Sequence, residues 1–210
     1  MFGFNIIGII AGVPGLIIAM VIHEYAHARM ADVMGDNTPR LTGRLTLNPL
    51  AHLDPIGLLM LLIVQFGWAK PVMITPSNFR DWRKGELFVS LAGPAANLLT
   101  AFIALLLMVI FVKLGFPMSY GLHLVFYLIV LYNINFAIFN MIPLPPLDGS
   151  KVLMTFLPTE WSYKLISIER YSFLILIGLM MTPILGSILI PLQRLILNVF
   201  TAIISIFITL

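Results

Sequence analysis

The sequence predicts an all-α integral membrane protein, a bundle of about four or five transmembrane helices. Of its 210 residues, 60% are hydrophobic and only 10% are charged, and the mean hydropathy is +1.03. Soluble domains carry about 25% charged residues, so this composition excludes an ordinary soluble domain. We expect one domain over residues 1–210, with a core at 4–156 and C-terminal helices at 159–210.

Apolar runs long enough to cross a bilayer recur along the chain. A spanning helix needs about 20 predominantly apolar residues. The last run is interrupted by Pro191 and Arg194, so it either spans the membrane or lies partly in the interface. The candidate spans are residues 4–31, 87–112, 120–142, 161–181 and 184–210.

Two short segments between the first and second runs differ from the others. Residues 56–66 are apolar but too short to span, which favours a re-entrant segment. Residues 67–75 have turn and strand character and predict a short membrane-embedded strand or β-hairpin. An exposed strand edge there would bind an extended substrate by strand addition. The candidate substrate-binding residues are Gly67, Trp68, Ala69 and Lys70.

The most informative motif is His23-Glu24-Tyr-Ala-His27 at the end of the first run. Ionisable side chains within a span are costly and mark a functional site. His23 and His27 lie on one helical face, about 6 Å apart along the axis, so both imidazoles can bind one Zn²⁺. Glu24 would then act as the base for a zinc-bound water. The alternative is a pair of histidines that reach the interface from the helix end.

A catalytic zinc site needs a third protein ligand, and the chain has no cysteine. Asp148 is favoured because it follows an Asn-containing span, on the same side as the HEYAH end, in a Pro-rich loop. Its alternative role is to cap the helix that follows. The full set of candidates is His52, Asp54, Asp81, His123 and Asp148.

The distribution of basic residues predicts the orientation in the membrane. Most Lys and Arg residues of the first half lie between the first and second spans, while the opposite loops carry little beyond Lys113. The positive-inside rule then places the N-terminus outside and the HEYAH end toward the cytoplasm, in a cell (inner or plasma) membrane. The net charge of +3 is explained in this way, so no nucleic-acid partner is expected.

Three motifs together resemble the site-2 protease family of intramembrane zinc metalloproteases. They are HEYAH at 23–27, SLAGPAAN at 90–97 and FNMIPLPPLDG at 139–149. The resemblance covers most of residues 15–155. It implies one zinc ion per chain, with His23, His27 and Asp148 as ligands and Glu24 as the catalytic acid and base. The chain departs from larger relatives because it has no room for a PDZ or CBS domain and no expected span ahead of the HEYAH helix.

The resemblance also implies roles in substrate binding. Asn140 would hydrogen-bond the substrate carbonyl or the developing oxyanion, although an interhelical packing bond is the alternative. The implied substrate is a transmembrane protein, such as a membrane-bound transcription regulator or a remnant signal peptide. Formation of a homodimer is left open by the sequence.

Two further residues and two other functions stay open at this point. His52 is a gate, a partner or transient ligand at the zinc, or a loop-structuring residue, and Asn97 either packs or supports a ligand. A metal transporter would need polar residues through the full membrane depth. A catalytically silent regulator that binds membrane helices would be expected to lack Glu24 or a ligand, and none is missing.

Overall fold

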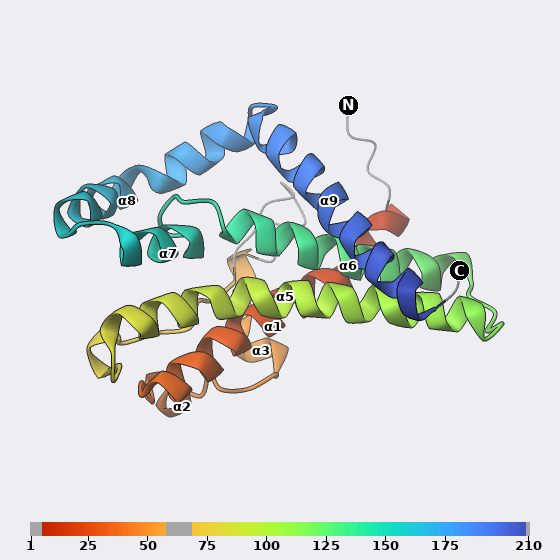
Figure 1. The fold of residues 1–210 in the computed structure, drawn as a ribbon, viewed down its shortest axis with the longest axis horizontal. Coiled ribbons are helices and arrows are strands. Elements are labelled where there is room, and N and C mark those ends of the chain that lie inside the picture. The colour runs from red at the N-terminus through yellow and green to blue at the C-terminus, as the bar shows by residue number, and fades with distance from the viewer. Residues whose placement is uncertain (1–5, 58–68, 209–210) are drawn as a thin grey trace.

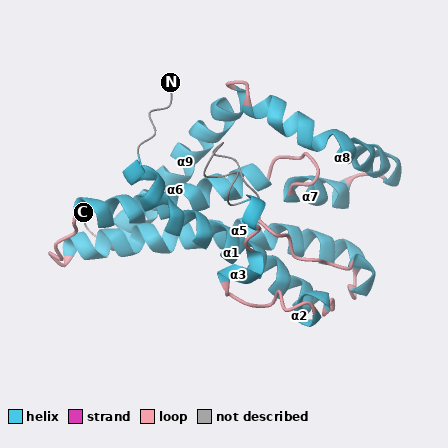
Figure 2. Ribbon diagram, turned by 180° about the vertical axis from the view of Figure 1, so that it is seen from behind, coloured by secondary structure: helices cyan, strands magenta, loops and turns pink. Residues whose placement is uncertain are grey.

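The structure is a computed structural model that describes residues 6–57 and 69–208. These residues are almost entirely helical, as the sequence predicts (Figures 1 and 2). The longer helices are α1 (Ile6–Met34), α5 (Trp82–Lys113), α6 (Tyr120–Asn140), α7 (Asp148–Phe156), α8 (Thr159–Met180) and α9 (Ile184–Phe207). Short helical turns are α2 (Thr38–Leu41), α3 (Pro49–His52) and η1 (Pro76–Asn78).

Helices α1, α5 and α6 pack against one another and form the core of the protein (Figure 1). Small residues allow close approach, as is common between membrane helices. A Cβ atom on Gly15 of α1 would lie 3.0 Å from the Ile129 backbone of α6. Between α5 and α6, Ala101 and Ala104 pack with Ile134 in an apolar cluster that side chains of α9 also contact.

The ends of the core helices are set by local capping groups. Asp81 accepts a hydrogen bond from the Lys84 N–H (3.1 Å) before α5, and Ser119 accepts one from the Leu122 N–H (3.3 Å) before α6. Such caps satisfy N–H groups that a helix start leaves free. Gly115 follows α5 with φ +72°, a left-handed conformation that suits glycine after a helix.

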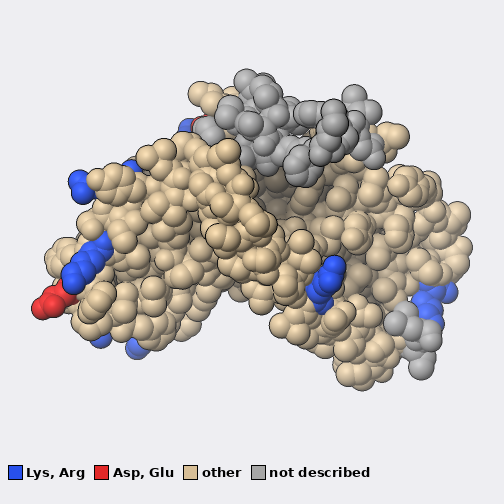
Figure 3. Space-filling view, turned by 90° about the horizontal axis from the view of Figure 1, so that it is seen from above, with Lys and Arg blue, Asp and Glu red and all other residues tan. Residues whose placement is uncertain are grey.

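Four helices of the described chain are long and apolar enough to cross a membrane: α1 from Ile7, α5, α6 and α9. The face shown in Figure 3 is covered mostly by uncharged residues, with Lys and Arg mainly near its two ends. The predicted span at 161–181 does form a helix, α8, but α8 is not among these four. It carries four charged side chains, Glu160, Lys164, Glu169 and Arg170.

The strand predicted near residues 67–75 is not formed in its described part, residues 69–75. Ala69 makes only an isolated antiparallel bridge with Leu53. Pro71 has no N–H to donate to a ladder, and the Val72 N–H bonds to a side chain instead, the carboxylate of Glu24. Residues 58–68, with most of the predicted re-entrant segment and with Gly67 and Trp68, lie outside the described residues.

A buried carboxylate ties the end of α1 to the segment that precedes α5. Asp36 is fully buried and accepts hydrogen bonds from the N–H (3.1 Å) and hydroxyl (2.5 Å) of Thr38. It also accepts bonds from the Thr75 N–H (2.7 Å) and the Asn78 side-chain amide (2.9 Å). Burial alone would raise the pKa of Asp36, but these hydrogen bonds outweigh it and hold the pKa below its usual value.

We therefore expect Asp36→Ala to lower the free energy of unfolding by about 2 to 3 kcal/mol, since several buried donors lose a charged acceptor. Because the folded-state pKa is depressed, the contribution of Asp36 is complete above the ordinary carboxyl pKa of about 4. It is lost as the pH falls through the folded-state pKa. Thermal denaturation of both proteins in detergent from pH 3 to 8 checks this. A difference that stays constant down to pH 3 would contradict the assignment.

Candidate metal centre

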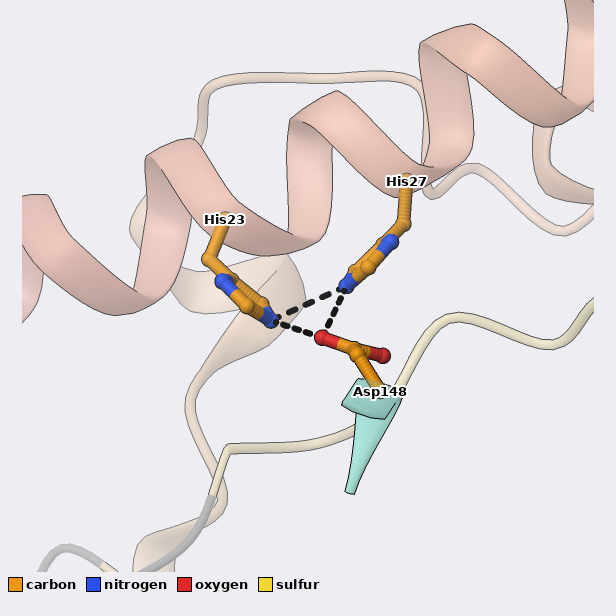
Figure 4. Close-up of side chains that lie close together, drawn as sticks. All are labelled: His23, His27 and Asp148. Carbon is orange, nitrogen blue, oxygen red and sulfur yellow. Dashed lines mark hydrogen bonds and ion pairs between the residues drawn. The ribbon is translucent and has the colours of Figure 1, made fainter. Parts of the chain in front are cut away.

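Three potential ligand atoms converge between α1 and the start of α7 (Figure 4). The Nε2 atoms of His23 and His27 are 2.9 Å apart. The Asp148 Oδ2 atom lies 3.1 Å from the first and 3.2 Å from the second. Ligand atoms about 2.05 Å from a tetrahedral zinc ion are about 3.3 Å apart, close to these separations. All three side chains are buried.

Hydrogen bonds at the far side of each ring show which nitrogen faces the centre with a lone pair. His23 Nδ1 lies 2.7 Å from Asn97 Oδ1, and His27 Nδ1 lies 2.7 Å from the Val89 carbonyl oxygen. Both partners are acceptors, so each Nδ1 is the donor and each neutral ring has a bare Nε2. Two bare nitrogens and a carboxylate oxygen then face one another, an arrangement that a cation between them stabilises.

The amide of Asn97 is itself oriented by two other helices. Its nitrogen donates to the Ala19 carbonyl of α1 (2.9 Å) and to the Asn133 side-chain oxygen of α6 (2.9 Å). Asn133 in turn donates to the Ile129 carbonyl (2.8 Å). With both amide hydrogens used, the Asn97 oxygen is left to accept from His23. The structure thus places Asn97, a candidate supporting residue from the sequence, directly behind the candidate ligand His23.

Gly93 provides the space that the two imidazoles occupy. A Cβ atom at this position would lie 2.5 Å from His27 Nε2 and 2.6 Å from His23 Cε1. Side chains do not tolerate such contacts, so α5 can lie against the two histidines only where it has no side chain. The glycine of the SLAGPAAN motif is therefore a steric requirement of the site.

Asp148 is the first residue of α7, and Leu147 precedes it as the cap position, without a side-chain cap bond. The alternative role of Asp148 as a helix cap is therefore wrong. The Asp148 side chain is buried, and its Oδ2 atom lies 3.1 and 3.2 Å from the two Nε2 atoms. A carboxylate in this position can serve as an anionic ligand for a cation held between the two rings.

Glu24 follows His23 on α1 and is half-buried. Its Oε2 atom accepts a hydrogen bond from the Val72 backbone N–H (2.9 Å). A segment far away in the sequence therefore contacts the carboxylate that the motif marks as a base. The sequence did not indicate Val72, because a backbone donor leaves no pattern in side-chain types.

The remaining candidates form hydrogen bonds with groups other than the three ligand atoms. Asn140 donates to the Phe136 carbonyl of its own helix (2.9 Å). His52 is fully buried, and its Nε2 atom lies 2.7 Å from the Thr46 carbonyl oxygen. Its backbone carbonyl accepts a bond from the Lys70 N–H (2.7 Å), so the His52 loop holds the segment that leads to Val72. Ala69 is half-buried and Lys70 is exposed.

A cavity of about 290 Å³ opens beside the candidate ligands. His27 and Asp148 form one side of it, and Glu86 and Lys151 contribute charged groups. Val72 belongs to an apolar wall. The sequence did not single out Glu86 or Lys151, and no motif in the chain contains both.

Comparisons with known proteins agree with this chemistry. The family described as "Peptidase family M50" matches residues 112–185, which include Asp148. The chain is 40% identical over 176 residues to "Putative zinc metalloprotease YwhC" of Bacillus subtilis, covering 82% of this chain and 80% of that protein. It is 31% identical over 185 residues to "Putative zinc metalloprotease Rip2" of Mycolicibacterium smegmatis, covering 83% and 68%. No solved structure matches significantly.

The sequence relatives and the four apolar helices together identify the family of this chain. Two relatives at 31% and 40% identity match this chain over most of their own lengths. The resemblance first suggested by the three motifs is thereby confirmed. The chain belongs to peptidase family M50, the site-2 protease family, and is a multi-pass membrane metalloprotease.

Proposed function

We propose that the protein cleaves peptide bonds within or near transmembrane segments of other membrane proteins, using one Zn²⁺ held by His23, His27 and Asp148. The observation that carries this proposal is the convergence of three buried ligand atoms, none more than 3.2 Å from its neighbour, in a bundle of apolar helices. The donor set of two imidazoles and one carboxylate is typical of catalytic zinc.

Different groups carry out the separate parts of the proposed peptide hydrolysis. Zinc, when bound, supplies the Lewis acidity that polarises the scissile carbonyl and acidifies a water molecule. Glu24 takes the proton from the water and passes it to the leaving amine. To do so it uses the oxygen that Val72 does not engage, or it releases the Val72 N–H. Asn140 would exchange its bond to Phe136 for one to the substrate carbonyl.

Substrate presentation follows from the membrane setting. A helical substrate must unwind before its peptide bond is accessible, and the freed backbone groups need partners at once. The segment from Ala69 to Val72 is proposed to supply them. The Lys70 and Val72 N–H groups are already bonded to His52 and Glu24. An incoming strand therefore pairs with the opposite edge, or it replaces the bond to Glu24.

The location proposed for the enzyme is a cell membrane, with the N-terminus outside and the metal centre toward the cytoplasm. The basic residues that surround α2 and the start of α5 support this orientation through the positive-inside rule. A membrane-anchored transcription regulator or a remnant signal peptide would present its transmembrane segment to a site at that depth.

Replacing Glu24 by Gln should abolish cleavage while leaving zinc bound. The amide keeps the size of the side chain but cannot accept the proton from water, so we expect a rate loss of about 10²- to 10⁴-fold. The measurement is cleavage of a transmembrane reporter in proteoliposomes, with zinc determined by elemental analysis. Glu160→Gln, at an exposed position on α8, is the matched control. Normal turnover by Glu24→Gln would remove Glu24 from the mechanism.

Replacing Asp148 by Ala should weaken zinc binding by more than about 100-fold, since losing a group that only supports a ligand already costs about 10- to 100-fold. Zinc content after dialysis against a chelator measures this, and Asp81→Ala, which removes an exposed helix cap, serves as the control. Chelation should also stop cleavage by the unmodified protein, and added Zn²⁺ should restore it. Zinc retention by Asp148→Ala would contradict the assignment of Asp148 and would indicate that another residue, such as His52, is the third ligand.

A further inference from the structure

The cavity beside the metal centre has charged side chains that the proposed mechanism does not use. Its volume is about 290 Å³, and His27 and Asp148 form part of its wall. A water molecule occupies about 30 Å³, so the cavity has room for an amino-acid side chain. Because the wall includes two candidate ligands, such a side chain would belong to a residue beside the scissile bond.

Lys151 and Glu86 reach this cavity from two different helices. Lys151 follows Asp148 by three positions on α7, so both side chains lie on one face, about 4.5 Å apart along the axis. Glu86 lies one turn before Val89 and Ser90, the part of α5 that contacts His27. Lys151 and Glu86 therefore have fixed positions relative to the metal centre.

Neither charge has a direct partner among the described side chains. Glu86 and Lys151 are both half-buried. No ion pair joins them, and the described ion pairs involve other residues. Partly buried charges without partners are costly. A polar group that enters the cavity and contacts both would offset this cost.

We propose that this cavity is a substrate subsite for a carboxamide side chain, Asn or Gln, next to the scissile bond. The inference rests on the proposed proteolytic function. A carboxylate only accepts hydrogen bonds and an ammonium group only donates them. A carboxamide donates through its NH₂ group to Glu86 and accepts through its oxygen from Lys151. An acidic side chain would be repelled by Glu86 and a basic one by Lys151.

The position of the cavity agrees with the proposed path of the substrate. Val72 lines the cavity together with Ile74, and Val72 belongs to the segment that would pair with the unwound substrate. Successive side chains of an extended chain point to opposite sides. A substrate held along this segment would therefore direct one side chain of each neighbouring pair toward the cavity.

A substrate scan with charge-reversed variants tests the subsite. A transmembrane reporter in proteoliposomes carries Asn, Gln, Asp, Lys or Leu at each position flanking the cleaved bond. For the unmodified protein, Asn and Gln at one position should raise kcat/KM by about tenfold over the other residues, the factor that 1.4 kcal/mol represents. Lys151→Glu should move the preference to Lys, and Glu86→Lys should move it to Asp.

Two controls separate this effect from general damage. Arg83→Glu reverses an exposed charge on the same helix outside the cavity, and it should leave the carboxamide preference unchanged. The double variant Glu86→Lys with Lys151→Glu should recover that preference, because a carboxamide can turn over and exchange its two ends. Where a reversal lowers zinc content, Lys151→Gln or Glu86→Gln replaces it, and each should reduce the discrimination.

A second readout does not depend on cleavage. The chain has no cysteine, so Lys151→Cys in the Glu24→Gln background supplies one thiol per chain, and its disulfide with a cysteine placed in the reporter is identified by the mass of the cross-linked product. Cross-linking should be strongest at the position where Asn is preferred. An identical preference profile in all variants, or cross-linking at other positions only, would overturn the subsite while proteolysis stands. Failure of the zinc-loaded unmodified protein to cleave any reporter would overturn the proposed function itself.

Discussion

The site depends on one electrostatic constraint: two imidazole lone pairs and a carboxylate oxygen meet in a buried place. Their separations of 2.9 to 3.2 Å would be repulsive without a positive charge among them. The surrounding structure holds this arrangement in place. Gly93 leaves room for the rings, and the Asn97 amide and the Val89 carbonyl bond their outer nitrogens.

The hydrogen bonds that join the core helices also orient a side chain of the candidate metal centre. Asn97 of α5 bonds simultaneously to the Ala19 carbonyl of α1, to Asn133 of α6 and to His23. In a membrane interior, where water does not compete, such bonds help to hold helices together. A rotation of any of the three core helices would therefore change the orientation of His23. The rigidity of the bundle and the readiness of the site to bind metal are linked through one side chain.

The sequence predicted the features that are encoded by side-chain type and spacing. The helical class and the core spans follow from the apolar runs, and the meeting of His23, His27 and Asp148 follows from their motifs. The sequence could not predict the contacts that backbone groups make with the site. The Val89 carbonyl behind His27 and the Val72 N–H at Glu24 leave no side-chain pattern. The prediction of a strand near residues 67–75 was wrong for the described residues 69–75, because the Val72 N–H bonds to a side chain rather than to a neighbouring strand.

The hydrogen bond between Val72 and Glu24 links the candidate base to the position of a segment outside its own helix. One oxygen of the carboxylate accepts a hydrogen bond from the Val72 backbone N–H, so the two oxygens of this side chain are not equivalent. A shift of Val72 would act on this carboxylate through a single hydrogen bond, with no intermediate residue. Under the proposed mode of substrate binding, an extended chain that moved this segment would change the hydrogen bonding of Glu24 in the same movement.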